Sequence, residues 1–433
     1  MRRIIVILCL SLMCLAIFVA CASYDHGLVT EDAENVSAIE PTLTIEQTPS
    51  PESELIPESE LEIEAIVALE SEIAPISDDT DIDDIEINDV EIDNIDMLIS
   101  QMSIYEKIGQ LFIVRMPTPQ YAQRLINDYH IGGFILFSSD VQSIEQVQRL
   151  TSALQETAQH NSNPPLFMAV DEEGGRVSRI GRLFPERSPS AYNLGQTGDP
   201  QNAYEAYYTI GQRLRYLGFN MNFAPVADIW SNPANTVIGD RAFGREPEIV
   251  ASMVEAAVHG LHSAGIIAVV KHFPGHGDTL EDSHYNMAFF NHDIERFDSV
   301  EAIPFQAGIA AGTEGIMMGH ITTPYISPEI RNNANLPATF CPYFMEQILR
   351  EEMGFDGLII TDALDMGALT NYFSQDEIVL EAFLNGADIL LMPSNPSVAI
   401  KTMVDAFQNG VFTEERLHQS LRRILYFKMR NSP

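Results

Sequence analysis

The loop from Lys271 to His284 is the part of the sequence richest in side chains that could do chemistry, since histidines and carboxylates alternate along it. Proline and glycine residues at positions 274, 275 and 277 forbid a regular helix, so this is not a helical zinc motif. A loop could still gather imidazoles and carboxylates around a metal ion, or use them only as anchors. The residues open to both interpretations are His272, His276, Asp278 and His284.

Other ionisable side chains come at or near the ends of short apolar runs. A single run that ends in Asp means little, because Asp is a common turn residue. Here five separate runs end in this way, and a site assembled from several of them is the simplest explanation. The residues concerned are Asp171, Asp228, Lys271 with His272, His320 and Asp362.

Eight such β-rich apolar runs follow residue 103, and amphipathic helical patterns lie between them. The runs are 110–114, 133–137, 166–171, 220–229, 266–272, 315–320, 357–362 and 387–393. The helical patterns include 144–159, 203–217, 248–264, 299–311, 343–352, 375–384 and 398–408. Near-continuous apolar strands that alternate with helices indicate parallel strands buried on both faces. The sequence therefore predicts an α/β fold over residues 101–433, a (β/α)8 TIM-type barrel in a single catalytic domain. An open doubly wound sheet is the alternative.

Four sequence blocks resemble the glycoside hydrolase family 3 β-N-acetylglucosaminidases of bacterial cell-wall recycling, and the likeness spans residues 103–430. The blocks are DEEGGRVSR at 171–179, IGDR at 238–241, the loop at 271–284 and TDALDM at 361–366. The third block is the most specific, because the pair Asp282 and His284 follows Lys271-His272 at the spacing that separates these enzymes from family 3 β-glucosidases. The resemblance implies the same barrel fold.

The resemblance also implies roles for individual residues. It makes Asp362 the nucleophile and His284 the general acid/base, paired with Asp282, and it implies neither a metal nor a cofactor. A retaining glycosidase needs a carboxylate to attack the anomeric carbon and a second group to protonate the leaving oxygen. An imidazole, with an ordinary pKa near 6.5, suits the second task near neutral pH. The implied sugar-binding residues are Asp171, Arg179, Arg241, Lys271 and His272.

The sequence leaves alternatives open. Asp362 could cap the following helix, while Asp228 and His320 could face the substrate or support the residues that do. The main functional expectation is an exo-acting, retaining hydrolysis of terminal β-linked N-acetylglucosamine from glycosides such as peptidoglycan fragments. The other candidates are a family 3 β-glucosidase or another β-glycosidase, a metal-dependent hydrolase using the His/Asp loop, and a non-catalytic sugar-binding lipoprotein.

The first 21 residues resemble a bacterial lipoprotein signal. Arg2 and Arg3 precede an apolar stretch from residue 4 to 19, and Ala20 comes directly before Cys21. Acylation of Cys21 would anchor the protein to the extracellular face of the cytoplasmic membrane. A plain signal peptide, which would release a secreted protein, and an uncleaved anchor are the alternatives.

Residues 22–100 form an acidic segment with 24 Asp and Glu and no Lys or Arg. Such a composition predicts a disordered, self-repelling linker, although the apolar residues from Ile82 to Leu98 could form a helix on docking. The whole chain carries a formal charge of −38, and residues 101–433 carry 22 − 38 = −16. This charge excludes an electrostatic nucleic-acid binder. The family resemblance implies an oligosaccharide as the partner, and the N-terminal segment implies the cell membrane.

Overall fold

A computed structural model of the 433-residue chain describes residues 89–326 and 336–431. The chain divides at residue 82, and everything below concerns the unit that begins at Asp83. The predicted signal at 1–21 and most of the predicted linker, up to residue 88, lie outside the described residues. No helix among the described residues is long and apolar enough to cross a membrane.

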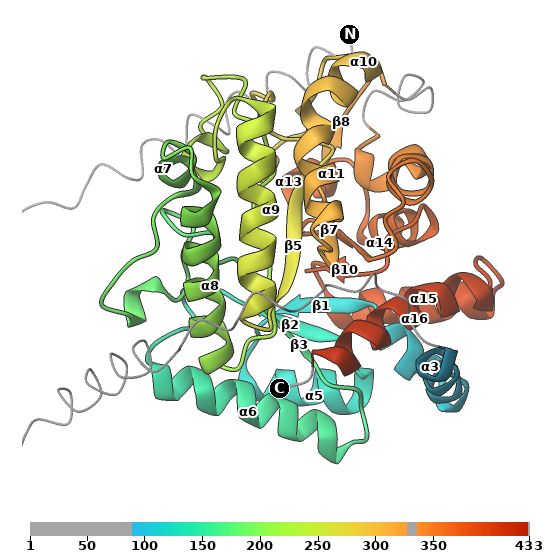
Figure 1. Cartoon of the computed structure of the whole chain (residues 1–433). Helices are drawn as coiled ribbons and strands as arrows, with labels where there is room; N and C mark the ends of the chain where they lie inside the picture. The colour runs from blue at the N-terminus through green and yellow to red at the C-terminus, as the bar shows by residue number, and fades with distance from the viewer. Residues whose placement is uncertain (1–88, 327–335, 432–433) are drawn as a thin grey trace, which may run out of the picture. The chain divides into compact units, whose positions relative to one another are not determined.

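Eight parallel strands form the centre of the described part of the molecule (Figure 1). Their order around the sheet is β10-β1-β2-β3-β4-β5-β7-β9, and a parallel bridge between Ile360 and Ile389 joins the last strand to the first. The sheet thus closes into the predicted (β/α)8 barrel, and the open-sheet alternative is wrong. The strands are β1 Phe112–Arg115, β2 Gly133–Leu136, β3 Phe167–Val170, β4 Met221–Asn222, β5 Ile267–Phe273, β7 Gly315–Met318, β9 Leu358–Thr361 and β10 Leu390–Leu391.

Each of the eight apolar runs of the sequence overlaps one of these strands. The run at 220–229 forms only the two-residue strand β4, since Pro225 has no N–H to donate to a neighbouring strand. Beyond it, Val226 still makes a single parallel bridge to Lys271. Nearly every strand residue is buried, which explains why the runs read as continuously apolar rather than alternating.

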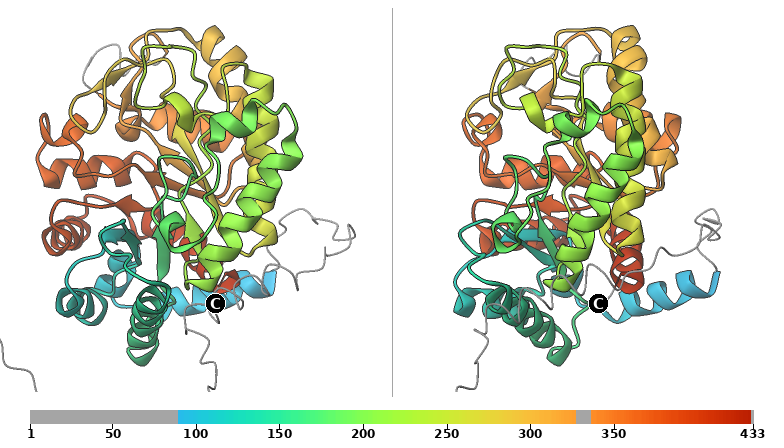
Figure 2. Two further views of the ribbon diagram at one scale, coloured as in Figure 1. Left: turned by 90° about the vertical axis from the view of Figure 1, so that its left-hand side faces the viewer. Right: turned by 60° about the vertical axis from the view of Figure 1, so that its left-hand side comes forward.

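Helices surround the strands (Figure 2), and the seven helical patterns of the sequence match observed helices to within three residues at each end. The main helices between successive strands are α5 Pro119–Tyr129, α6 Ile144–His160, α8 Pro200–Tyr216, α9 Pro247–Ser263, α11 Ala302–Ala310, the π-helical segment Tyr343–Glu352 and α14 Gln375–Leu384. Two more, α15 Pro396–Gln408 and α16 Glu414–Arg430, follow the last strand. Shorter helices are α4 Ile104–Gly109, α7 Ala191–Gly195, α10 Ile294–Arg296 and α13 Gly367–Thr370. The core therefore lies between the barrel and this outer layer.

The end of the predicted linker is part of the folded domain. Residues Asp89–Gln101 form helix α3, which packs against α16 (Figure 1). The side chains of Ile95 and Ile99 are buried in the main core, and Asp96 accepts two hydrogen bonds from Arg422. The boundary predicted near residue 100 therefore falls at the end of a helix that packs on the domain, because these apolar side chains find a partner surface that only the folded domain supplies.

A second, two-stranded sheet lies in the loops that follow the barrel strands. Strand β6 Ala288–Phe289 pairs in parallel with β8 Ile321–Thr322. This sheet joins the segment after β5 to the segment after β7. It thereby fixes the position of the C-terminal end of the long loop that contains His284.

Candidate functional site

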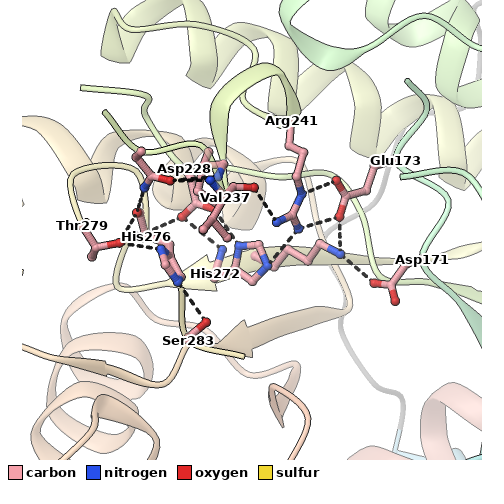
Figure 3. Close-up of polar contacts among 12 residues, drawn as sticks. Asp171, Glu173, Asp228, Val237, Arg241, His272, His276, Thr279 and Ser283 are labelled. Carbon is pink, nitrogen blue, oxygen red and sulfur yellow. Dashed lines mark hydrogen bonds and ion pairs between the residues drawn. The ribbon is translucent and has the colours of Figure 1, made fainter. Parts of the chain in front are cut away.

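A network of charged side chains gathers residues from three barrel strands and their loops (Figure 3). The Nζ atom of Lys271, two residues before the end of the buried strand β5, lies 2.7 Å from Asp171 Oδ1 and 2.6 Å from Glu173 Oε1. Arg241 forms a bidentate pair with Glu173, and both of its donor–acceptor distances are 2.8 Å. Such a planar pair holds the guanidinium in one orientation. Three of the five residues predicted to bind sugar therefore share one connected cluster.

Glu173 is the centre of this cluster, although the sequence analysis gave it no role. Its side chain is 2% exposed, and burial alone would raise its pKa. The adjacent cations Arg241 and Lys271 outweigh burial and lower the pKa of Glu173 far below its ordinary value. Glu173 thus remains ionised and fixes both cations, which could then donate hydrogen bonds to sugar hydroxyls.

Glu172, the preceding residue, points elsewhere. Its carboxylate accepts hydrogen bonds from the backbone N–H groups of Arg179 and Ile180 and from the Ser178 hydroxyl. Burial raises the pKa of Glu172 despite these bonds. Glu172 therefore shapes the turn that presents Arg179.

Arg179 lies at the edge of the cluster. Its Nη2 atom is 3.9 Å from Asp171 Oδ2, and its guanidinium packs over the ring of Phe137, 5.4 Å from the centroid. The Nε atom of Arg179 is buried and has no hydrogen-bond partner among the described residues. This donor is free to meet an acceptor that enters the site.

His272 is held by the strand-end carboxylate Asp228. Its Nδ1 lies 2.6 Å from Asp228 Oδ2, and its Nε2 faces Arg241 at 3.3 Å. Asp228 also accepts the backbone N–H of His276. Burial raises the pKa of Asp228, but the two imidazoles outweigh it and lower the pKa. Asp228 therefore orients His272 rather than facing outward itself.

Asp362 lies directly after strand β9, where its backbone N–H donates to the carbonyl of Met318 on β7. Burial raises the pKa of Asp362, but the imidazoles of His320 and His272 and the N–H of Ala363 outweigh this and lower the pKa. The carboxylate is therefore ionised at neutral pH, as a nucleophile must be. His320 is fully buried beside it and donates from Nε2 to the carbonyl of Ala363.

His284 and Asp282 form a second His–carboxylate pair on the long loop after β5. Their Nδ1–Oδ1 distance is 2.7 Å, and the His284 side chain is 62% exposed. The carbonyl of His284 accepts the N–H of Gly367, which opens helix α13 just after Asp362. The loop is thus hydrogen-bonded to the Asp362 segment through the backbone. The structure records no direct contact between the side chains of His284 and Asp362.

The four residues considered for a metal site each have other partners. His272 contacts Asp228, His276 contacts Thr279 and Ser283, and His284 contacts Asp282. Asp278 contacts Ser231 and His292. Among the described residues, no group of three or more His, Cys, Asp or Glu could hold a metal ion.

The sequence signal that could have identified Glu173 was its place within the DEEGGR block. Gly174 and Gly175 both have positive φ, 84° and 56°, so the backbone makes a sharp turn immediately after the two glutamates. The turn sends one carboxylate into the cation cluster and leaves the other in the loop. Without the backbone conformation, the sequence does not indicate which of the two glutamates enters the cluster.

Residues 103–427 match the model of the glycosyl hydrolase family 3 N-terminal domain. The chain is 37% identical over 333 residues to β-hexosaminidase A from Pseudoalteromonas piscicida, a match covering 72% of this chain and 55% of that protein. It is also 37% identical over 250 residues to a β-hexosaminidase from Xylella fastidiosa strain M23, covering 56% of this chain and 70% of that protein.

Among solved structures, the chain is similar to a glycoside hydrolase family 3 β-N-acetylglucosaminidase from Paenibacillus sp. str. FPU-7. The TM-score is 0.73 with 38% sequence identity, and the match covers 76% of this chain and 63% of that one. The chain therefore spans less than two thirds of the length of both the Pseudoalteromonas protein and the Paenibacillus structure.

Proposed function

The chain belongs to glycoside hydrolase family 3, and from this premise we propose that it is an exo-acting, retaining glycosidase. It removes terminal β-linked N-acetylglucosamine from glycosides such as peptidoglycan fragments. The naming of its relatives as β-hexosaminidases and β-N-acetylglucosaminidase supports this substrate class.

In the proposed reaction, Asp362 attacks the anomeric carbon while the His284 imidazolium gives a proton to the leaving oxygen. A covalent glycosyl ester forms at Asp362, and His284, now neutral, then takes a proton from the water that hydrolyses the ester. Asp282 orients the imidazole through its hydrogen bond to Nδ1. The configuration at the anomeric carbon is retained because two inversions occur.

The sugar is held by the charged cluster in this proposal. Lys271, Arg179 and Arg241 donate hydrogen bonds to hydroxyl oxygens, and Asp171 accepts hydrogen bonds from hydroxyl groups. The Nε2 side of His272 contacts the same sugar. The cluster is pre-organised, because Glu173 fixes Lys271 and Arg241, and Asp228 fixes His272, through contacts of 2.6 to 2.8 Å.

The single observation that carries the proposal is the pairing of two different ionisable groups at one rim. An ionised strand-end carboxylate, Asp362, is linked through the Gly367–His284 backbone hydrogen bond to an exposed, carboxylate-paired imidazole. One group suits nucleophilic attack and the other suits proton transfer.

Hydrolysis rates on aryl β-glycosides of N-acetylglucosamine and of glucose test the proposal. We expect turnover of the first, unaffected by a chelator, and a much lower kcat/KM for the second. Preference for glucose would favour a β-glucosidase, and loss of activity with a chelator that zinc restores would favour the metal hydrolase. Absence of turnover on both glycosides would favour the non-catalytic sugar-binding lipoprotein.

We further propose that the protein is exported and acylated at Cys21, with the acidic segment between anchor and domain acting as a tether. The charged start at Arg2 and Arg3, the apolar stretch and the Ala20-Cys21 pair support this. The enzyme would then act at the extracellular face of the cytoplasmic membrane, where wall fragments are available.

A further inference from the structure

Asp278 and His292 form a His–carboxylate pair that the proposed reaction does not use. The Nε2–H of His292 donates to Asp278 Oδ2 at 2.7 Å, and both side chains are partly buried. The second carboxylate oxygen of Asp278 accepts the Ser231 hydroxyl at 2.8 Å, and the Asp278 carbonyl accepts the side-chain amide of Asn232. Asp278 is thus fixed to the loop that follows β4.

This pair closes the base of the loop that carries His284. Residues 279–291 lie between Asp278, five residues after the end of strand β5, and His292, three residues after the end of strand β6. Between these points Leu280 and Tyr285 are 64% and 70% exposed, whereas Ser283 and Met287, on either side of the exposed residues 284–286, are buried. Only the tip of the loop around His284 therefore lacks packing of its own. A segment with few buried contacts depends on its anchors for its position.

His292 is itself fixed in orientation. Its ring meets the buried ring of Phe290 edge-on at 5.1 Å, and the neighbouring strand β6 pairs with β8. A second link inside the loop joins His276 Nε2 to the Ser283 hydroxyl at 3.0 Å, one residue before His284. The Asp278–His292 pair and this inner link, together with the hydrogen bond from the Gly367 N–H to the His284 carbonyl, define the path of the backbone on both sides of His284.

We propose that His292 and Asp278, completed by Ser231, are positioning residues that place His284 at the glycosidic oxygen. The inference rests on the proposed glycosidase function. Proton transfer needs the imidazole within hydrogen-bond reach of that oxygen, and a displacement of about 1 Å can cost up to roughly 100-fold in rate. Loss of the pair therefore impairs leaving-group protonation and leaves attack by Asp362 unchanged.

The test compares His292→Phe with His292→Gln on two substrates. Phenylalanine keeps the ring and its contact with Phe290 but has no donor, whereas glutamine offers an amide N–H in the position of Nε2. We expect His292→Phe to lower kcat/KM about tenfold on the β-linked N-acetylglucosamine disaccharide. The burst rate with a nitrophenyl glycoside, which needs little protonation, should change by less than about threefold. His292→Gln should restore most of the loss.

His262→Phe is the matched control, because His262 forms a similar pair with Glu314 at 2.9 Å, between α9 and the start of β7. His262→Phe should lower the rates on both substrates by the same factor or not at all. Ser231→Ala, which removes only one of the contacts to Asp278, should show a smaller loss with the same selectivity and covers the case in which His292→Phe does not fold.

Two results would overturn the proposal: an equal loss on both substrates, which marks a purely structural pair, or no loss on either. A wild-type protein with no turnover on either substrate would instead reject the underlying glycosidase function, so the two failures are distinguishable.

Discussion

At the scale of single residues, Asp362 and His284 carry unequal parts of the proposed reaction. Asp362→Asn should lower kcat roughly 10³-fold or more for every leaving group, because an amide cannot form the glycosyl ester. His284→Ala should lose about 10² to 10⁴-fold on a disaccharide and much less in the first step on a nitrophenyl glycoside. Pre-steady-state bursts with the activated substrate measure the difference.

For His284→Ala, a burst followed by slow turnover is the expected signature. The ester at Asp362 forms without a general acid, but its hydrolysis is slow because no general base activates the water. An equal loss on both substrates without a burst would remove His284 from the acid/base role. Circular dichroism of both variants would establish that they fold.

Glu173 tests the electrostatics of the cluster at the same scale. Glu173→Gln leaves Arg241 without its buried carboxylate and should lower the free energy of unfolding by about 3 kcal/mol at pH 7. Because the pKa of Glu173 is lowered in the folded state, its contribution is complete above the unfolded pKa near 4.3 and is lost as pH falls through the folded pKa. The variant should therefore lose less stability between pH 7 and pH 3 than the wild type.

Denaturant unfolding across this pH range measures the effect, with Glu255→Gln, an exposed carboxylate on α9, as the control. The control should follow the wild-type curve. A Glu173→Gln curve parallel to the wild type would mean that Glu173 is protonated alike in both states.

At the scale of elements, helix α3 is the least expected part of the domain. Ile99→Ala should lower the free energy of unfolding by about 2 to 4 kcal/mol, because the side chain is 1% exposed in the core. Met97→Ala, on the same helix but 55% exposed, should change it by less than about 0.5 kcal/mol. Thermal unfolding of both variants checks this.

The same helix changes where the chain can be shortened. A chain that begins at Asp89 should match the full mature chain in stability and in turnover of a soluble substrate, whereas one that begins at Ser103 should be less stable, since it lacks Ile95 and Ile99. Equal stability of the two shortened chains would show that α3 does not hold to α16 in solution and would restore a boundary near residue 100.

At the scale of the whole molecule, the proposed acylation at Cys21 would decide where the protein works. Cys21→Ser should move the protein from the membrane fraction to the soluble or secreted fraction without altering its rate on a soluble glycoside, since no acyl chain can then be attached. Cys14→Ser, within the apolar stretch, is the matched control and should leave fractionation unchanged. Unchanged membrane association of a cleaved Cys21→Ser protein would exclude a lipid anchor.

The sequence by itself determined the barrel. Eight apolar runs separated by helical patterns specify buried parallel strands, because apolar character and periodicity are local properties that the chain carries before it folds. The ionisable residues at the ends of these runs had to meet at one rim, since all parallel strands end on the same side. The family resemblance then assigned expected roles to eight of those rim and loop residues.

Only the tertiary structure decided which neighbours those residues have. Glu172 and Glu173 are chemically identical and adjacent, yet the turn at Gly174-Gly175 places one among cations and the other among backbone N–H groups, and their pKa values shift in opposite directions. Likewise, the link from Asp278 to the loop after β4 and the docking of α3 on α16 join segments distant in sequence. Such contacts depend on how the whole chain closes, and no local pattern encodes that.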